Sequence, residues 1–271
     1  MLARPLLLAF VLAASLLAGC ADDGGDGTTT TSPATTSPAM TPVTTTPSGG
    51  EAFVVGTDAA FPPFEELTVT GAFEGFDIDV MDEIAFRNGW TVSFQNLAFD
   101  ALIPSLQSGD VDLVISAMSI NENRSQVVDF SIPYYEANQS ISQLASDTNV
   151  YASLDDLEGK GIRFGAQSAT VAVDIIEARF PGDELKRYDT YPLALQALAA
   201  GEVDVVMMDA PAQKEAAQSE GTIKVAFEFS VGDVYGIAVP KGSADLAAVN
   251  DALEAMQDDG TLLDLREKWG I

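Results

Sequence analysis

Two segments of this 271-residue chain are similar to each other at a constant spacing of 92 positions, residues 106–116 and residues 198–208. Each runs from a predicted helix end through glycine, an acidic residue, valine and aspartate into an apolar strand. Glycine is the residue expected just after a helix, and a wholly apolar strand is typical of a sheet buried on both faces. A match of this length also arises by chance. The preferred interpretation is a pair of similar α/β lobes whose ligand loops lie beyond the carboxyl ends of their strands.

A β-α-β unit precedes the first of these segments. Residues 53–56 form a short apolar run, residues 77–88 have apolar side chains at helical spacing, and residues 91–94 form a second apolar run. Gly89 stands where a glycine commonly ends a helix. The unit is typical of a parallel α/β sheet, and the cleft between two such lobes is the expected site.

The charge and the missing histidine exclude several kinds of function. The chain has 41 acidic and 13 basic residues, a formal net charge of −28 and no histidine. We expect no nucleic-acid partner, because the few cationic side chains are scattered and form no basic patch. Histidine-dependent catalytic triads and imidazole-bound metals are excluded. No calcium-loop pattern is present, so we expect neither a metal nor another cofactor.

The amino-terminal region predicts export and a lipid anchor. Residues 1–19 contain Arg4 and an apolar run too short to span a bilayer of about 30 Å, which is typical of a signal peptide. Small residues then precede Cys20, the single cysteine, in a pattern similar to a lipobox, although such a pattern also arises by chance. The rest of residues 20–50 is rich in Thr, Ser and Pro and is predicted to be a disordered tether. These features place the remainder outside the cytoplasm, anchored to the outer face of the membrane through Cys20.

A polar turn that follows the first apolar strand is a candidate anion site. Ser119 and Glu122 match a capping box, which predicts that a helix begins at Ser119 and offers free N–H groups to an anion. Arg124, one turn later, has the planar fork that binds a carboxylate through two hydrogen bonds. The alternative is that Arg124 forms an ion pair with Glu122 or Asp129 on a solvated helix face.

Two further segments complete the predicted binding groups for an amino acid. The turn that contains Ser168, Ala169 and Thr170 precedes a predicted helix at residues 171–180 and offers more N–H donors from the second lobe. Asp209 lies just past the second repeated segment and supplies a fixed negative charge for an ammonium group. Its alternative role is that of a helix cap or turn residue before Pro211.

An aspartate among aromatic residues predicts the wall of a pocket. Asp58 follows the first strand, and Phe61, Phe64 and Phe99 lie in nearby loops. Each phenylalanine alone fits a hydrophobic core equally well. As a group beside Asp58 they indicate an aromatic wall, where a cationic side chain would gain about 0.5–2 kcal/mol of cation–π attraction.

These residues belong to motifs that resemble family 3 of the extracellular solute-binding proteins of ABC transporters, which have the type II periplasmic binding protein fold. The similarity covers residues 51–271. The matching motifs are GTDAAFPPFE (56–65), GFDIDVM (75–81), FDALIPSLQ (99–107), SAMSINENR (116–124), VDFS (128–131), YY (134–135), YGIAV (235–239), DGT (259–261) and KW (268–269).

The resemblance implies two α/β lobes with central mixed sheets, joined by two hinge strands near residues 134–138 and 232–236. The first lobe is then discontinuous and comprises residues 51–138 and 234–271, while residues 139–233 form the second lobe. The resemblance also implies a monomer that binds a free L-amino acid by hinge closure and delivers it to a membrane permease.

Site roles follow from the same resemblance. Arg124 is expected to bind the ligand α-carboxylate, helped by the backbone N–H groups of Ser119 and of the turn at residues 168–170. Asp209 and the carbonyl of Ala117 are expected to bind the α-ammonium group. Phe61 and Phe99 would then sandwich the ligand side chain.

Departures from the family pattern bear on the ligand. Glutamine-binding members commonly have a lysine at the position that corresponds to Gly165 of this chain. They commonly have a histidine at the position that corresponds to Met208. Asp58, facing the polar end of the ligand side chain, favours arginine, lysine or histidine, with glutamine next. The alternative function is an enzyme on the same fold, similar to an arogenate or prephenate dehydratase, with Glu65, Glu66 or Asp58 as the acid.

Overall fold

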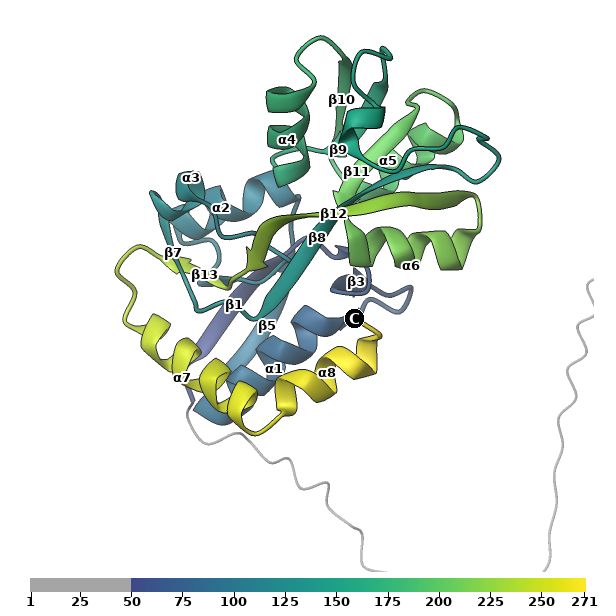
Figure 1. The fold of residues 1–271 in the computed structure, drawn as a ribbon. Helices are drawn as coiled ribbons and strands as arrows, with labels where there is room; N and C mark the ends of the chain where they lie inside the picture. The colour runs from purple at the N-terminus through teal and green to yellow at the C-terminus, as the bar shows by residue number, and fades with distance from the viewer. Residues whose placement is uncertain (1–49) are drawn as a thin grey trace, which may run out of the picture. The chain divides into compact units, whose positions relative to one another are not determined.

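The computed structural model describes residues 50–271. They form two α/β lobes, each built on a five-stranded mixed sheet, and strands β8 and β12 run side by side from one lobe to the other (Figure 1). The predicted signal peptide, Cys20 and the Thr/Ser/Pro-rich tether up to residue 49 lie outside the described residues. Within residues 50–271, no helix is both long enough and apolar enough to cross a membrane.

Lobe 1 contains the predicted β-α-β unit, because β1 and β5 pair in parallel and α1 connects them. Helix α1 spans Phe76–Asn88 and ends at Gly89, whose φ of 68° is the left-handed conformation predicted for it. The sheet order of lobe 1 is β5 (Thr91–Asn96), β1 (Ala52–Thr57), β6 (Leu113–Val114), β13 (Ala238–Pro240) and β7 (Val128–Phe130).

Helices cover both faces of this sheet. Helices α1, α7 (Asp245–Asp258) and α8 (Thr261–Trp269) contact one another on one face, as Figure 1 shows, while α2 (Phe99–Ser108) contacts β1, β6 and β13. Successive side chains of β1 point to opposite faces of the sheet. Val55 belongs to the same core cluster as residues of α1, and Val54 packs against the cluster that contains residues of α2. A small antiparallel sheet of β2 (Ala60–Phe61), β3 (Glu65–Leu67) and β4 (Phe73–Glu74) precedes α1.

Lobe 2 repeats the strand pattern of lobe 1. Across each sheet, in the spatial order of its strands, the first two neighbouring pairs are parallel and the last two are antiparallel. Its sheet order is β10 (Glu184–Tyr188), β9 (Arg163–Gln167), β11 (Val205–Asp209), β8 (Tyr135–Leu144) and β12 (Ile223–Tyr235). Its helices are the short 3-10 helix at Leu154–Asp156, α4 (Val171–Arg179), α5 (Tyr191–Ala199) and α6 (Ala210–Glu220).

The two aspartates of the repeated sequence segments occupy equivalent places in the two sheets. Asp112 accepts a hydrogen bond from the backbone N–H of Val54 at 2.7 Å, and its own N–H donates to the Val54 carbonyl at 2.8 Å. Asp204 makes the same two bonds with Arg163, each at 2.8 Å. The similarity between the segments therefore reflects one structural role: in each lobe the aspartate forms two hydrogen bonds that join the strand after it to the parallel neighbouring strand.

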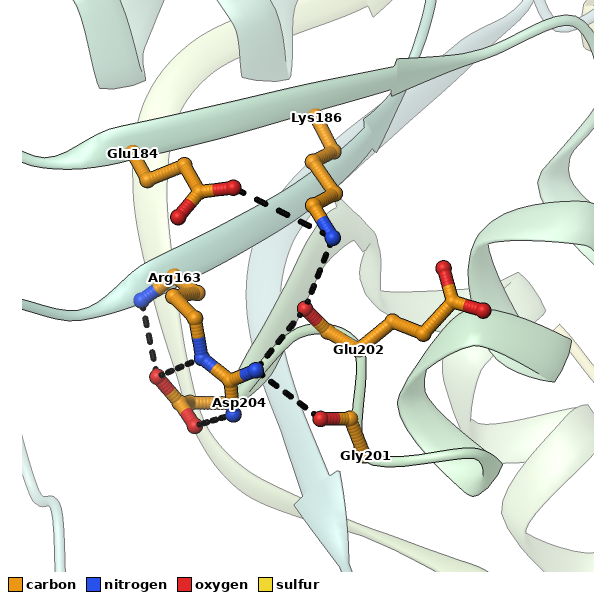
Figure 2. A network of polar contacts seen from close by, with 6 residues as sticks. All are labelled: Arg163, Glu184, Lys186, Gly201, Glu202 and Asp204. Carbon is orange, nitrogen blue, oxygen red and sulfur yellow. Dashed lines mark hydrogen bonds and ion pairs between the residues drawn. The ribbon is translucent and has the colours of Figure 1, made fainter.

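In lobe 2 a network of charged groups surrounds this aspartate (Figure 2). The Arg163 guanidinium binds both carboxylate oxygens of Asp204, through Nη2 at 2.5 Å and Nε at 3.1 Å. Nη1 donates to the carbonyls of Gly201 and Glu202, and Lys186 donates to the Glu202 carbonyl at 3.2 Å. The loop between α5 and β11 is thus tied to β9 and β10.

The two segments predicted as hinges lie next to each other. Tyr135 pairs with Tyr235 and Ala137 with Asp233, and the register of β8 and β12 shifts before the strands continue into lobe 2. Both strands belong to the lobe 2 sheet over most of their length. The exact lobe boundaries at residues 138 and 233 stay a prediction.

Candidate functional site

A pocket of about 340 Å³, including its open mouth, lies between the lobes. It is lined by Asp58, Phe61, Glu65, Phe99, Ser116, Ala117, Ser119, Arg124, Gln167, Thr170, Val171, Met208 and Asp209. The structure therefore brings together eight of the ten residues predicted to bind ligand. The other two, Ser168 and Ala169, belong to the turn between β9 and α4, next to Thr170.

Asp58 is buried in the pocket wall, with 5% of its surface exposed. Its backbone N–H donates to Ser116 Oγ at 2.9 Å, and its side chain accepts a hydrogen bond from Gln167 Nε2 at 2.6 Å. Burial raises the pKa of Asp58 to about 6, although the bonds from Gln167 and from the backbone of Phe99 oppose that rise. Among the residues that the structure describes, the Asp58 side chain thus has a hydrogen-bonding partner, Gln167, and forms no ion pair.

The three phenylalanines have different positions. Phe61 is buried at the pocket and packs edge-on against Tyr191, with ring centroids 5.6 Å apart. Phe99 lines the pocket, and the Arg124 guanidinium lies over its ring, with 5.2 Å between Arg124 Cζ and the ring centroid. Phe64 is fully buried against Phe76, Tyr135 and Tyr235 and does not line the pocket, so its inclusion in the aromatic wall was wrong.

Arg124 connects the two lobes. Nη1 donates to the Ser119 carbonyl at 2.7 Å in lobe 1, and Nη2 donates to the Ala169 carbonyl at 2.8 Å in lobe 2. Burial lowers the pKa of Arg124, while the charges of Asp233 and Asp209 raise it. Of the two acids proposed as alternative partners, Asp129 forms its ion pair with Lys241.

The expected helix start at Ser119 was wrong. Helix α3 is only Glu122–Ser125, and its cap is Asn121, whose side chain accepts the Arg124 N–H at 2.9 Å. Ser119 instead forms a β-bridge with Tyr235, and its hydroxyl donates to Asp233 at 2.9 Å. Pairing with the long strand β12 keeps this stretch extended, so it cannot begin a helix.

Asp209 lies at the end of β11 and is 5% exposed. It stands at the cap position of α6, where the alternative interpretation placed it, but its side chain forms no cap bond. Its carboxylate instead accepts hydrogen bonds from Tyr235 Oη at 2.5 Å and from Gln139 Nε2. Burial and the neighbouring charge of Asp233 raise the pKa of Asp209 to about 7, while the hydroxyl, the amide and Arg124 oppose the rise.

The turn after β9 brings lobe 2 backbone to the pocket. Ala169 has a φ of 60°, an uncommon conformation for a residue with a side chain. The Thr170 hydroxyl donates to the Gln167 carbonyl at 2.8 Å and fixes the turn. The Ser168 N–H already donates to the Tyr188 carbonyl at 2.8 Å, so in this conformation it is not a donor for a ligand.

Gln167, rather than Gly165, is the pocket residue of β9. A side chain at Gly165 would meet Val203 and Val206 in the interior of lobe 2, and Gly165 does not line the pocket. Gln167 is 3% exposed and lines the pocket, as Met208 does. The position of Gln167 at the carboxyl end of β9, next to the predicted turn at residues 168–170, was the signal that could have identified it. Gln139 lies among other polar residues of β8 and had no such signal.

Metal ligation has no support among the residues that the structure describes. No group of three or more Asp, Glu, Cys or His side chains in this part of the chain could hold a metal ion. The acids of the pocket instead accept hydrogen bonds from hydroxyl and amide groups.

Comparison with known proteins identifies the family. Residues 53–271 match the model of the bacterial extracellular solute-binding proteins, family 3. ABC transporter arginine-binding protein 1 of Escherichia coli (strain K12) is 35% identical over 228 residues, which are 82% of this chain and 92% of that protein.

Solved structures agree with this match. An ancestral arginine-binding protein bound to arginine has a TM-score of 0.75 at 38% identity, covering 80% of this chain and 97% of that one. An ancestral arginine-binding protein bound to glutamine has a TM-score of 0.76 at 39% identity, covering 82% of this chain and 99% of that one. The ancestral amino acid-binding protein AncCDT-1, a precursor of cyclohexadienyl dehydratase, has a TM-score of 0.74 at 31% identity, covering 80% and 94%. The chain therefore belongs to family 3 of the bacterial extracellular solute-binding proteins.

Proposed function

We propose that the protein captures one free polar amino acid between its lobes and delivers it to the membrane permease of an ABC importer. The observation that carries this proposal is the placement of Arg124 and Asp209 in one pocket, close enough for the charge of Arg124 to act on Asp209. A guanidinium and a buried carboxylate are complementary to the α-carboxylate and α-ammonium groups of an amino acid. The names and bound ligands of the relatives support the same class of ligand.

The ligand side chain is cationic in this proposal, with arginine first. Asp58 is a second buried carboxylate, and a neutral amide from Gln167 is its side-chain partner. A buried carboxylate without a cation is costly, and a guanidinium or ammonium group from the ligand would supply the missing charge. Phe61 and Phe99 lie beside it and suit the alkyl part of such a side chain. Glutamine is the next candidate.

Capture occurs by hinge closure. Gln167 and Arg124 already bridge the lobes through Asp58 and the Ala169 carbonyl. A ligand held by both lobes shifts the hinge equilibrium toward the closed state, because only the closed state presents all of its binding groups. In the proposed complex the ligand carboxylate accepts hydrogen bonds from the Arg124 guanidinium in place of one of its carbonyl partners. Asp209 and the Ala117 carbonyl bind the ammonium group.

Calorimetric titration of the purified protein with each of the twenty amino acids tests class and specificity together. We expect measurable binding of arginine, weaker binding of glutamine and no binding of apolar amino acids. Tighter binding of glutamine or glutamate than of arginine would refute the cationic assignment, and no binding of any amino acid would refute the proposed function itself.

The proposed activity is binding without catalysis. The curated and structural relatives described above are binding proteins, although one is a precursor of a dehydratase. Glu65 lines the pocket and could be imagined as an acid, but its Oε1 atom accepts a hydrogen bond from Ser116. Incubation with prephenate, followed by an assay for phenylpyruvate, should show no turnover above the uncatalysed rate.

The anchor and the assembly state complete the proposal. Lipidated Cys20 would hold a monomer at the outer face of the membrane, with residues 20–50 as the tether and the lobes divided at residues 138 and 233. Mass spectrometry of the mature amino terminus should find diacylglyceryl-cysteine at Cys20, and Cys20→Ala should release the protein from membranes. Sedimentation of the released protein tests the monomer.

A further inference from the structure

Two buried acids, Glu65 in the pocket wall and Asp77 outside the pocket lining, have no role in the binding scheme above. Glu65 in β3 is 1% exposed, and Asp77 in the first turn of α1 is fully buried. The two carboxyl groups are neighbours, because they bind the consecutive residues Ser116 and Ala117 and each affects the pKa of the other. Burying two ionised carboxylates side by side would be very costly, because both lose water and they repel each other.

Each acid makes defined contacts through one oxygen. Glu65 Oε1 accepts a hydrogen bond from Ser116 Oγ at 2.7 Å. Asp77 Oδ2 accepts two, from the Ala117 N–H at 2.6 Å and from Tyr134 Oη at 2.8 Å. The other oxygens, Glu65 Oε2 and Asp77 Oδ1, are buried and receive no bond from an N–H or O–H donor of the described residues. A single proton between the two carboxyl groups satisfies both of these oxygens.

The charges around the pair favour keeping that proton. Burial and the charges of Asp77 and Asp58 raise the pKa of Glu65 well above its usual value, and the bond from Ser116 only partly opposes them. Burial raises the pKa of Asp77 to about 7 against the bonds from Ala117 and Tyr134. The pKa of the Tyr134 phenol is itself raised well above its usual value, so it faces the pair as a neutral donor. Within residues 50–271 neither acid forms an ion pair, and the charges that raise the pKa of Glu65, those of Asp77 and Asp58, are negative.

The contacts of the pair lead to the ligand pocket. Ser116 Oγ, which donates to Glu65, accepts the backbone N–H of Asp58, and Ala117 lines the pocket with a φ of 42°. A residue with a side chain holds such a backbone conformation only where its surroundings fix it, and here the Asp77 carboxylate binds the Ala117 N–H. Tyr134, the third donor, immediately precedes the hinge strand β8.

We propose that Glu65 and Asp77 share one proton and act as positioning residues for the amino-acid pocket, holding the Ser116–Ala117 turn so that Asp58 and the Ala117 carbonyl face the ligand. The positioning role rests on the proposed function, since it concerns the same site. The proton sharing itself rests only on the buried pair and is tested without a ligand.

Single and double amide substitutions distinguish proton sharing from simple packing. In Glu65→Gln the amide oxygen still accepts from Ser116, and its NH₂ group donates to Asp77. In Asp77→Asn the amide oxygen still accepts from Ala117 and Tyr134, and its NH₂ group donates to an ionised Glu65. In the double variant two NH₂ groups face each other, and neither has an acceptor.

Binding of L-arginine is measured by calorimetry at pH 7, and thermal unfolding without ligand is followed from pH 5 to pH 8. Each single variant should bind arginine within about threefold of the wild type, whereas the double variant should lose about tenfold or more. Glu254→Gln, on the exposed surface of α7, is the control and should change neither quantity. Circular dichroism verifies that each variant is folded.

The pH profile gives an independent result. The folded wild type keeps a proton that the unfolded chain has released at neutral pH, so its Tm should fall as pH rises from 5 to 8. This fall should be smaller in both single variants, because an amide replaces the protonated group. Equal losses in the single and double variants, or an unchanged pH profile in both single variants, would overturn the shared proton. If arginine does not bind the wild type, the proposed function and the positioning role fail, while the ligand-free Tm values still decide the proton sharing.

Discussion

Gln167 donates a hydrogen bond from its side-chain amide to the carboxylate of Asp58 across the cleft, with 2.6 Å between Nε2 and Oδ2. Gln167 ends β9 in lobe 2 and Asp58 follows β1 in lobe 1, so this bond joins the lobes. A second bond, from Gln167 to the Asp189 carbonyl at 3.2 Å, holds the amide from its own lobe. The neutral amide orients Asp58 but leaves its negative charge available to a ligand.

A lysine at position 167 should therefore change the specificity. In Gln167→Lys the ammonium group would neutralise Asp58 and repel a cationic ligand side chain. We expect arginine affinity to fall by about tenfold or more, while glutamine affinity changes less, because its side chain carries no charge. Gln218→Lys on the exposed surface of α6 adds the same charge away from the pocket and serves as the control. Equal losses for both ligands would contradict this role for Asp58.

Removal of the Arg124 guanidinium should abolish binding without unfolding the protein. Arg124→Ala removes the proposed carboxylate fork and leaves its counter-charges, Asp209 and Asp233, buried and unpaired. We expect at least about a 100-fold loss of affinity by calorimetry, with an unchanged circular dichroism spectrum. Arg179→Ala, which removes an exposed arginine of α4 paired with Asp155 and Glu158, should bind as the wild type does. Unchanged affinity in Arg124→Ala would show that the carboxylate binds elsewhere.

Arginine binding should strengthen as pH rises from 5 to 8. In the ligand-free protein the pKa of Asp58 is about 6 and that of Asp209 about 7, both raised mainly by burial, so both acids are largely protonated at pH 5. A cationic ligand needs them ionised, so binding releases protons near pH 6–7. Titrations in two buffers of different ionisation enthalpy measure this release directly. Constant affinity across this range, with no proton release, would contradict the assignment.

The aspartates of the repeat should stabilise the fold without affecting the ligand. Asp112→Ala and Asp204→Ala each remove the acceptor for a strand-start N–H group, at a cost of about 1 kcal/mol in the free energy of unfolding. Asp204→Ala should cost slightly more, because Arg163 also loses its ion pair, although a pair this exposed adds little to stability. Urea denaturation measures the stability, and arginine titration should show unchanged affinity in both variants. A loss of affinity would indicate that the network in Figure 2 reaches the pocket.

Local patterns in the sequence predicted the elements that depend on neighbouring residues. Helix α1 with its left-handed Gly89, the parallel pair β1 and β5, and the similar lobes all follow from apolar periodicity and glycine placement. The repeated aspartates were visible for the same reason, since each acts on a strand that local pattern already predicts. The residues at strand ends, Asp58 and Asp209, could be identified as pocket groups because parallel strands end at one edge of a sheet.

Ser119 shows what local pattern could not decide. Its sequence matches a helix cap, yet pairing with Tyr235, more than a hundred residues away, keeps it extended. Phe64 and Gly165 are similar cases, because the direction of a side chain depends on which neighbours pack against its strand or loop. Gln167 met Asp58 only because two strands from different lobes end at the same cleft.

The sequence by itself determined the fold class, the family motifs and most residues of the pocket, because these depend on local periodicity and on the order of the strands. Only the tertiary structure decided which acids face a cation, which share a proton and which are bound by hydroxyl or amide groups. Those choices depend on burial and on distances of a few ångströms between segments far apart in the chain. Glu65 and Asp77 are the clearest example, since twelve residues separate them in sequence and only folding removes the water that would let both ionise.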